Sequence, residues 1–435
     1  MALSAANPEL AKALGDALRA RGIDAEVTGD PGKARAGLIV LTEGVQPGNA
    51  ATDRHWNVLN QCKNLRDCGV PIILLGWHEH ARAAELSGLH GLARTLRQEW
   101  PDARISALDV STECSPQDMA RAMLAGVPDG RLAQGKLSVE QISERALALP
   151  AAAPASKGGN WLITGGARGV TAACTIELAR HFRSGTIFLA GRSEIVDWPA
   201  DLPVCDDLKT LRSALVARAR QRAERPRPAE IDQEARALLA GQDVRRTLAS
   251  LSDAGVCAHY IQLDISKRKK VAAQVKRLVD THGAITGLVH GAGVLADRLA
   301  AQKTKTDVTR VFAPKVDGLL NLLSGLDLTS LQYCGLFCSA AAVFGNPGQS
   351  DYAMANAWLN AAARDLHAKH DHLTVKSFCW GPWAGGMVDE TLAAQFEDRG
   401  IPLIGLQDGA EIFARHLLYA GRGSVNLLIG ERWPS

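Results

Sequence analysis

"WLITGGARGVTAACTIELAR", residues 161–180, indicates an apolar strand, a tight glycine turn and then a helix. Gly165, Gly166 and Gly169 let the backbone approach a pyrophosphate closely, and the amides and dipole at the start of the helix attract its charge. The stretch therefore predicts a dinucleotide-binding turn, although a purely structural strand, turn and helix is the alternative when it is taken alone. Thr171 stands where such a turn often has a third glycine, so we expect the helix to pack slightly differently there.

The same alternation of strand and helix continues downstream of this turn. Further apolar runs indicate strands at 186–193, 258–266, 285–293, 333–340 and 374–382. Alternation of this kind is typical of a parallel sheet covered by helices on both faces. The connection between the second and third strands is too long for a simple crossover, and its leucines follow helical spacing on either side of Pro226 and Pro228. We interpret residues 194–257, approximately, as a helical insertion whose arginines form a solvated face or, as the alternative, a partner surface.

Upstream of the turn, the chain has the rhythm of a second nucleotide-binding fold without its phosphate loop. Apolar runs at 36–41 and 70–77 precede an amphipathic stretch at 89–100, and no glycine-rich turn follows either run. Residues 147–160, rich in Ala, Pro, Ser and Gly, indicate a linker. The predicted class is therefore α/β with two Rossmann-like halves: a truncated structural subdomain at 1–150 and a doubly wound parallel sheet at 151–435.

Composition narrows the function classes. Forty-nine Lys and Arg against 46 Asp and Glu give a formal charge of +3, spread without long blocks, which argues against a nucleic-acid surface. Nine cysteines without a CxxC pair predict free thiols. No apolar run is long enough to span a bilayer, and the first residues lack a signal-peptide pattern, so we expect a soluble, cytoplasmic protein. Histidines cluster at His78 and His80 and again at 367–372, but no ligand set is complete, so we expect no metal site.

Cofactor selectivity is indicated at the end of the second strand. The sequence there is "LAGRS", in which no acidic residue is available for a ribose 2′-hydroxyl, whereas Arg192 and Ser193 suit a 2′-phosphate. This favours NADPH over NADH. Asp264, which ends the third strand, is a candidate for the adenine amino group or, alternatively, a helix N-cap. Gly291 and Gly293 allow backbone to lie against the cofactor at the end of the fourth strand.

The residues that indicate chemistry lie in "FCSAAAVFGNPGQSDYAMAN", residues 337–356. Ser339 follows a strand, and Tyr352 comes thirteen positions later. One helical turn beyond the tyrosine stands Asn356, where a phenol that transfers a proton would benefit from a cation. Each residue also has an ordinary interpretation, as a core tyrosine, a capping serine or a packed amide.

Taken together, these motifs resemble the ketoreductases of polyketide synthases, which are relatives of the short-chain dehydrogenases/reductases. Residues 160–400 resemble the catalytic half of that family, and residues 1–147 resemble its truncated structural half. In this family the lysine comes from an earlier helix and an asparagine takes its usual place. Lys315, in "FAPKVDGLLNL", matches the relocated lysine.

The resemblance implies a role for each matching residue. Tyr352 would protonate the forming alkoxide, Ser339 would hold the carbonyl oxygen, Lys315 would favour the ionised phenol, and Asn356 would order water or the lysine. It also implies that NADPH contacts a set of residues around the strand ends: Thr164, Gly165, Gly166, Arg168, Gly169, Val170, Arg192, Ser193, Asp264, Ile265, Gly291, Ala292, Gly293 and Pro382.

Two further stretches bear on the substrate. "WGPWAGG", residues 380–386, resembles the wall and lid over the nicotinamide, with Gly385 and Gly386 as a hinge and Trp383 as either lid or packing residue. "VLADRL" resembles a loop that often reads Leu-Asp-Asp in enzymes that form the 3R alcohol; Asp297 is kept and Ala296 replaces the first acid. Phe344 stands where the opposite class usually has Trp. Both marks favour a 3R product.

The insertion and the "TGGARGVT" turn are most similar to the ketoreductases of polyunsaturated fatty acid synthases and related iterative synthases. The implied reaction is reduction of a 3-ketoacyl chain on an acyl carrier protein, within a larger synthase. Three alternatives stay open: a free-standing reductase of small or CoA-linked ketones, a catalytically silent scaffold domain, and a module that only senses NADPH.

Overall fold

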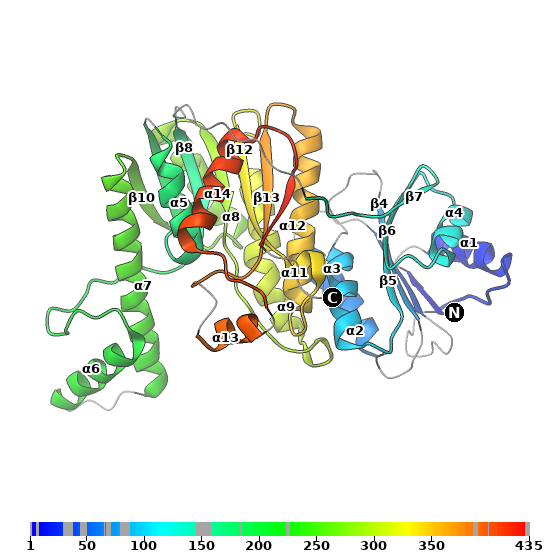
Figure 1. The fold of residues 1–435 in the computed structure, drawn as a ribbon, viewed down its shortest axis with the longest axis horizontal. Coiled ribbons are helices and arrows are strands. Elements are labelled where there is room, and N and C mark those ends of the chain that lie inside the picture. Colours follow the sequence, from blue (N-terminus) through cyan, green and yellow to red (C-terminus); the bar gives the residue numbers. More distant parts are fainter. Residues whose placement is uncertain are drawn as a thin grey trace.

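The computed structural model contains two seven-stranded sheets that lie side by side (Figure 1). This confirms the predicted α/β class with two Rossmann-like halves. The structure describes residues 2–5, 8–28, 38–43, 50–64, 66, 71–78, 88–144, 158–182, 184–222, 227–385, 390–398 and 400–430.

The C-terminal sheet is entirely parallel, with the strand order β10-β9-β8-β11-β12-β13-β14. Its strands are β8 (Gly159–Thr164), β9 (Gly185–Gly191), β10 (Cys257–Gln262), β11 (Ile285–His290), β12 (Tyr333–Ser339), β13 (Thr374–Trp380) and β14 (Asn426–Ile429). The order reverses between β8 and β11. In open parallel sheets, ligands bind at the carboxyl ends of the strands beside such a switch point.

Helices cover both faces of this sheet. One face is covered by α5 (Gly169–Arg180), α7 (Pro228–Asp253) and α14 (Leu406–Tyr419), and the other by α8 (Arg268–His282), α9 (Lys305–Phe312), α10 (Gly318–Gly325) and α12 (Ser350–Lys369). The remaining elements are short or peripheral: α6 (Leu208–Gln221), α11 (Ala341–Phe344), α13 (Glu390–Asp398), a 3₁₀ turn at Ala300–Gln302 and a π-helical turn at Ala313–Asp317. The apolar strands of the sheet are therefore buried between two layers of helices.

The N-terminal sheet has the order β2-β1-β3-β4-β5-β6-β7. Its strands are β1 (Ala2–Ala5), β2 (Glu26–Val27), β3 (Leu38–Glu43), β4 (Ile72–His78), β5 (Ile105–Ser111), β6 (Asp129–Ala133) and β7 (Lys136–Ser138), and its helices are α1 (Pro8–Arg19), α2 (Ala50–Lys63), α3 (Gly88–Glu99) and α4 (Pro116–Leu124). All its pairings are parallel except the hairpin of β6 and β7.

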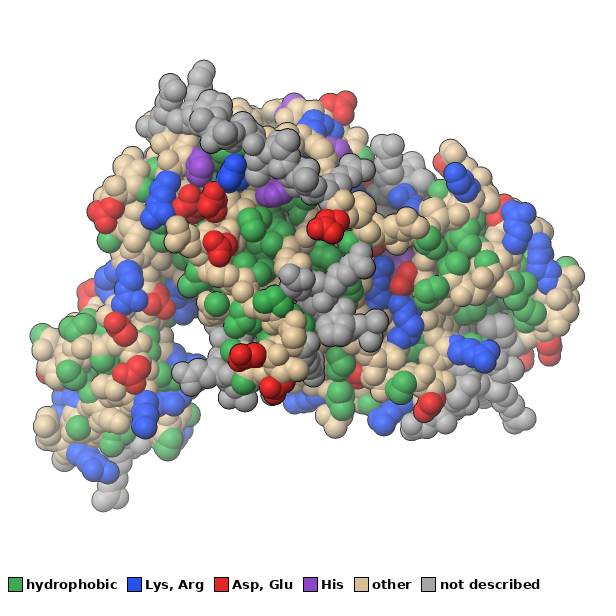
Figure 2. Space-filling view, in the orientation of Figure 1, with side chains coloured by type: hydrophobic (Ala, Val, Ile, Leu, Met, Phe, Trp, Pro, Cys, Tyr) green, Lys and Arg blue, Asp and Glu red, His purple; other side chains and the backbone are tan. Residues whose placement is uncertain are grey.

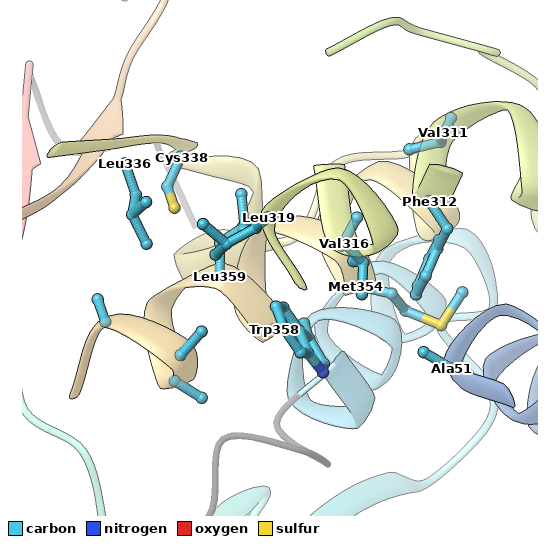
Figure 3. Packing of buried hydrophobic residues seen from close by; sticks show 14 of the residues in the cluster. Ala51, Val311, Phe312, Val316, Leu319, Leu336, Cys338, Met354, Trp358 and Leu359 are labelled. Carbon is cyan, nitrogen blue, oxygen red and sulfur yellow. The ribbon is translucent and has the colours of Figure 1, made fainter. Parts of the chain in front are cut away.

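One hydrophobic cluster joins the two sheets. It contains residues of α2, α3, β4 and β5 together with residues of α9, α12, β11 and β12. Figure 3 shows Met354 and Trp358 of α12 packed among Phe312, Val316 and Ala51. Helices α3 and α12 approach so closely that a Cβ atom on Gly91 would overlap the carbonyl oxygen of Ala353. The absence of a side chain at this position therefore permits the contact between the two halves.

Residues 194–257 include all of α6 and α7. The end of α7 packs on the sheet, whereas α6 and the start of α7 form an arm that projects from the body (Figure 1). The arm has its own small apolar core, in which Leu211 and Leu215 of α6 meet Ala235 and Leu238 of α7. Many of its arginines pair with acidic residues of the same arm: Arg212 and Arg236 with Asp232, Arg218 with Glu234, and Arg222 with Asp201. Figure 2 shows basic and acidic side chains interspersed over it. These pairs favour a solvated face over a basic partner surface.

Several other expectations concern membranes, metals and thiols. Within the described ranges, none of the helices combines the length and apolar character needed to cross a bilayer. The described residues include no group of three or more His, Cys, Asp or Glu side chains placed to hold a metal ion. The eight cysteines in the described part of the chain are free thiols. The side chains of His78 and His80, and residues 147–157 of the predicted linker, lie outside the described residues.

A charged cluster ties α3 to its own sheet. His90 lies 3.2 Å from an Asp109 oxygen and 3.3 Å from an Asp129 oxygen, and Arg94 and Arg97 also contact Asp129 at 3.3 and 2.7 Å. Burial would lower the pKa of His90, but the charge of Asp109 and hydrogen bonds to Asp109 and Asp129 raise it to about 9. His90 is therefore charged at neutral pH and forms ion pairs with the carboxylates of Asp109 and Asp129.

Because the pKa of His90 is raised on folding to about 9, its stabilising contribution should be complete below its unfolded pKa of about 6.5 and lost as the pH rises to about 9. We expect His90→Gln to lower the free energy of unfolding by about 3 kcal/mol near pH 6 and by much less near pH 9.5. Urea unfolding at both pH values measures this, with the exposed His259→Gln as control. An equal loss at both pH values would contradict the charged state of His90.

Candidate active site

The glycine turn between β8 and α5 is shaped by close backbone contacts. Gly165 has φ +72°, and a Cβ atom on it would lie 2.8 Å from the carbonyl carbon and oxygen of Gly291 at the end of β11. A Cβ atom on Gly291 would in turn overlap the side chain of Thr171. The side chain of Thr171 thus fills the space that Gly291 leaves free. This explains how the turn accommodates a threonine where such turns often have a third glycine.

The residues expected at the ribose lie around the end of β9. Arg168, which precedes α5, and Arg192, which follows β9, are both exposed. Tyr260 of β10, which the sequence analysis missed, donates from its hydroxyl to the Ser193 carbonyl at 2.6 Å, and a Cβ atom on Gly191 would lie 2.6 Å from the same hydroxyl. Burial raises the pKa of Tyr260. Tyr260 therefore supports the turn that presents Arg192 and Ser193.

Asp264 is engaged within its own turn. One of its carboxylate oxygens accepts from the Ser266 amide at 3.0 Å and from the Ser266 hydroxyl at 2.7 Å. Burial would raise the pKa of Asp264, but these hydrogen bonds and the charges of Lys267 and Arg192 lower it. The carboxylate is therefore ionised, organises the turn before α8, and lies within electrostatic reach of Arg192.

The structure brings together the four residues expected to carry the chemistry. Lys315, 3% exposed, donates from Nζ to the Phe337 carbonyl at 3.1 Å and to Asn356 Oδ1 at 2.9 Å, and Nζ lies 5.2 Å from the centroid of the Tyr352 ring. Asn356 Nδ2 donates to the Tyr352 carbonyl at 2.8 Å, one turn back along α12. Ser339 ends β12 beside them, and the phenol of Tyr352 interacts with the side chains of both Asn356 and Ser339.

Local structure explains how Lys315 reaches this position. It lies in the π-helical turn at Ala313–Asp317, between α9 and α10. π-helical turns of this kind occur frequently at functional sites. A Cβ atom on Gly293 would lie 2.8 Å from Lys315 Cε, so the missing side chain at Gly293 leaves room for the lysine stem.

Removal from water dominates the electrostatics of the site. Burial raises the pKa of Tyr352 to about 12, although its hydrogen bonds with Asn356 and Ser339 act in the opposite direction. Burial also lowers the pKa of Lys315 to about 8. We expected Lys315 to lower the pKa of the phenol; the pKa is raised instead, because loss of hydration has the largest effect on it. At neutral pH the phenol is therefore protonated and the lysine is mostly charged.

His290 is a residue of the site that the sequence analysis missed. It ends β11, is fully buried, and has its Nδ1 2.9 Å from Thr164 Oγ1 and its Nε2 2.9 Å from the Lys315 carbonyl. Burial and the charge of Lys315 lower the pKa of His290 to about 4, so the ring is neutral. Because a carbonyl only accepts, Nε2 donates to Lys315 and Nδ1 accepts from the Thr164 hydroxyl. A buried polar residue at the end of an apolar strand was the available signal.

Two expectations concern the wall and the stereochemical loop. Trp383 is 5% exposed and packs edge-on against Trp380, with ring centroids 4.7 Å apart, so it is a packing residue in this structure. Pro382 accepts at its carbonyl from the Ile404 amide, which closes this wall, and Gly386 of the expected hinge lies outside the described residues. Asp297 is exposed and accepts from Gln349 Nε2 at 3.1 Å.

Similarity to known proteins gives the family of the chain. Residues 159–385 match the family described as the KR domain. The chain is 33% identical over 365 residues to one component of a polyunsaturated fatty acid synthase from Thraustochytrium sp., covering 80% of this chain and 13% of that protein. It is 28% identical over 349 residues to the polyketide synthase PksL of Bacillus subtilis, covering 77% of this chain and 7% of that protein. The chain thus spans only a small part of these relatives.

Solved structures show the same fold. A ketoreductase from the first module of phoslactomycin biosynthesis in Streptomyces sp. HK803 superposes with a TM-score of 0.73 at 19% identity, covering 99% of this chain and 88% of that one. A ketoreductase domain from the bacillaene assembly line gives a TM-score of 0.70 at 21% identity, with coverages of 98% and 91%. Together with the family match, these likenesses identify the chain as a member of the KR domain family, the ketoreductases of polyketide and polyunsaturated fatty acid synthases.

Proposed function

We propose that this ketoreductase reduces a 3-ketoacyl thioester on an acyl carrier protein to the 3R-hydroxyacyl thioester, with NADPH as hydride donor, within a polyunsaturated fatty acid or polyketide synthase. The observation that carries the proposal is the buried contact of Lys315 with Asn356 beside the Tyr352 ring, at the carboxyl end of β12. This contact lies at the same edge of the sheet as the glycine turn after β8. The similarity to the Thraustochytrium polyunsaturated fatty acid synthase supports a fatty acyl substrate.

The residues around the β8 turn fit a dinucleotide phosphate. The backbone is free of side chains at Gly165 and Gly291, where a Cβ atom would collide with its neighbours, and α5 begins directly beyond the turn. Arg168, at the start of α5, and Arg192, after β9, are both exposed, and their charges suit a 2′-phosphate. Bound NADPH would supply a hydride to the ketone carbon.

The chain's own residues would supply the rest of the chemistry. In reduction the acid must begin protonated, and the pKa of about 12 keeps Tyr352 in that state at neutral pH. Ser339 would donate to the ketone oxygen and so share its developing negative charge. As Tyr352 gives up its proton, the charged Lys315 would stabilise the phenolate across the ring. Asn356 would hold Nζ of Lys315 in place by the 2.9 Å hydrogen bond.

We further propose that residues 1–150 are a structural subdomain that supports loops of the catalytic subdomain, residues 151–435. Helix α3 contacts the backbone that leads from Ser339 to Tyr352: Arg94 donates to the Ala342 carbonyl at 2.8 Å and Gln98 to the Phe344 carbonyl at 2.5 Å. Glu99 accepts from the amides of Gly348 at 2.9 Å and Ala300 at 2.7 Å. One carboxylate from the N-terminal half thereby links two loops of the other half.

The remaining parts of the proposal concern product, partner and compartment. Asp297, the acid retained in the loop after β11, supports the 3R assignment. The far greater length of both relatives supports a place among other synthase domains, with the acyl carrier protein as partner. Free thiols throughout the described part of the chain are consistent with the reducing cytoplasm. The convergence of Ser339, Tyr352, Lys315 and Asn356 argues against a silent scaffold and against a module that only senses NADPH.

Replacing the acid tests the chemistry. We expect Tyr352→Phe to lower kcat with a 3-ketoacyl thioester by about 100- to 10,000-fold, because the proton donor is lost. NADPH oxidation at about 340 nm measures the rate, and protein fluorescence measures the dissociation constant of NADPH, which should change by less than about twofold. Tyr333→Phe is the matched control, because Tyr333 lies at the opposite end of β12 from Ser339. A rate unchanged by Tyr352→Phe would refute the mechanism.

Cofactor selectivity is tested at the end of β9. Loss of a charge-assisted contact to the 2′-phosphate should make Arg192→Ala raise KM for NADPH by about 10- to 100-fold while KM for NADH stays the same. Steady-state kinetics with both cofactors measure this, with the exposed Arg180→Ala as control. An equal increase in KM for NADPH and for NADH would show that Arg192 does not recognise the 2′-phosphate.

The support from α3 is tested at Glu99. Glu99→Ala leaves two loop amides without their acceptor, so we expect a loss of about 1–3 kcal/mol in the free energy of unfolding and a lower kcat. Chemical denaturation and the reductase assay measure these effects. Exposed Glu113→Ala should change neither. If Glu99→Ala had the free energy of unfolding and the kcat of the unmodified chain, the supporting role of the N-terminal half would be contradicted.

A further inference from the structure

A fully buried ion pair lies beside the site and has no part in the mechanism above. Lys303 follows the 3₁₀ turn at Ala300–Gln302, and Asp351 immediately precedes Tyr352 in α12. Lys303 Nζ lies 2.6 Å from Asp351 Oδ1, and the two side chains are 0% and 1% exposed. Both charges have thus been removed from water, next to the residue proposed as the acid.

Each side chain of the pair also forms a hydrogen bond with a backbone group. Lys303 Nζ donates to the Ala296 carbonyl at 2.5 Å, directly before Asp297. Asp351 Oδ1 accepts from the Tyr352 amide at 2.8 Å. The pair therefore joins the loop at residues 291–299 to the first turn of the helix that carries the phenol.

Neighbouring contacts run between the same two segments. The Arg298 amide donates to the Gly348 carbonyl at 2.9 Å, and Gln349 Nε2 donates to Asp297 at 3.1 Å. The charge of Asp297 contributes to the raised pKa of Tyr352, which places that carboxylate within electrostatic reach of the phenol. The position of the loop and the position of the acid are consequently coupled.

Stability alone does not account for this pair. Apolar residues of similar volume often stabilise a core as well as a buried ion pair does, because the desolvation of two charges is avoided. Asp351 Oδ2 is also buried and has no hydrogen-bond partner among the described residues, so the pair is incompletely satisfied. Unlike an apolar contact, the two charged groups form directional hydrogen bonds. Nζ and Oδ1 each bind one defined backbone group and so fix its position.

We propose that Lys303 and Asp351 are positioning residues for the proposed ketoreduction, which clamp loop 291–299 against the start of α12 and so determine which face of the ketone meets the acid. The inference rests on the proposed function. The pair acts through the loop and through Tyr352, and it contacts neither the glycine turn nor Arg192. Its loss should therefore affect turnover and product configuration more than NADPH binding.

The test compares single and double replacements. Lys303→Met and Asp351→Asn each leave a buried group without its partner, so both should lower the melting temperature. We expect each to reduce kcat by about 10- to 100-fold, because misplaced reacting groups react slowly. The fraction of the minor alcohol, measured by chiral chromatography of the product from a 3-ketoacyl thioester, should rise clearly, and the dissociation constant of NADPH should not change.

The double variant Lys303→Met/Asp351→Leu separates positioning from stability. It should recover the melting temperature, because no charge is buried, and still give the mixed alcohols and the low kcat. Lys305→Met is the matched control, since Lys305 lies two residues away and pairs with Asp53 at the surface. A double variant with wild-type kcat and product ratio would overturn this inference alone. Absence of alcohol from the unmodified chain would overturn the proposed function and the inference together.

Discussion

The buried contact between Lys315 and Asn356 is the interaction on which the rest of the site depends. An ammonium group that is 3% exposed must find acceptors, and here they are a side-chain oxygen of α12 and a carbonyl of β12. That requirement is met by the surrounding structure. Gly293 leaves room for the lysine stem. His290 accepts a hydrogen bond from the Thr164 hydroxyl and donates one to the backbone carbonyl of Lys315. The ends of β8, β11 and β12 are thereby linked through one network.

The same burial sets the electrostatic character of the site. In water a nearby ammonium would lower the pKa of a phenol, yet the phenol of Tyr352 has a raised pKa and Lys315 a lowered one. Both shifts oppose charge, because both groups have lost hydration. The site thus holds its phenol protonated and its cation close. In the proposed reaction, a developing negative charge on a substrate oxygen would be balanced without water having to rearrange.

Two separate sheets contribute to one site because their helices pack against each other. Helix α3 lies against α12 over a glycine contact, and its polar side chains bind backbone between Ser339 and Tyr352 and at Ala300. A sheet without a phosphate loop can therefore act on catalysis through backbone support. The Lys303–Asp351 pair has the same character within the C-terminal half, since each charge holds a backbone group near the site.

Much of the fold and part of the site could be predicted from the sequence because the relevant signals are local. Strand and helix periodicity indicated the two α/β halves, and β9, β12 and α3 lie within a few residues of their expected positions. The glycine turn and the spacing of Ser339, Tyr352 and Asn356 follow from one strand and one helical turn. Lys315 was found only through a family resemblance, because nothing in its own segment marks it as different from a surface lysine.

Contacts between distant segments were decided only by the tertiary structure. His290 was not identified because the sequence does not show which acceptor lies opposite a strand end, and the partner of Lys303 is 48 residues away. Glu99 is about 200 and 250 residues from the amides it accepts. The direction of the Tyr352 pKa shift also depended on burial, which is a property of the packed chain. The sequence by itself thus determined the local elements and the spacing of Ser339, Tyr352 and Asn356, whereas hydration and long-range partners were set by packing, because they exist only once the chain has folded.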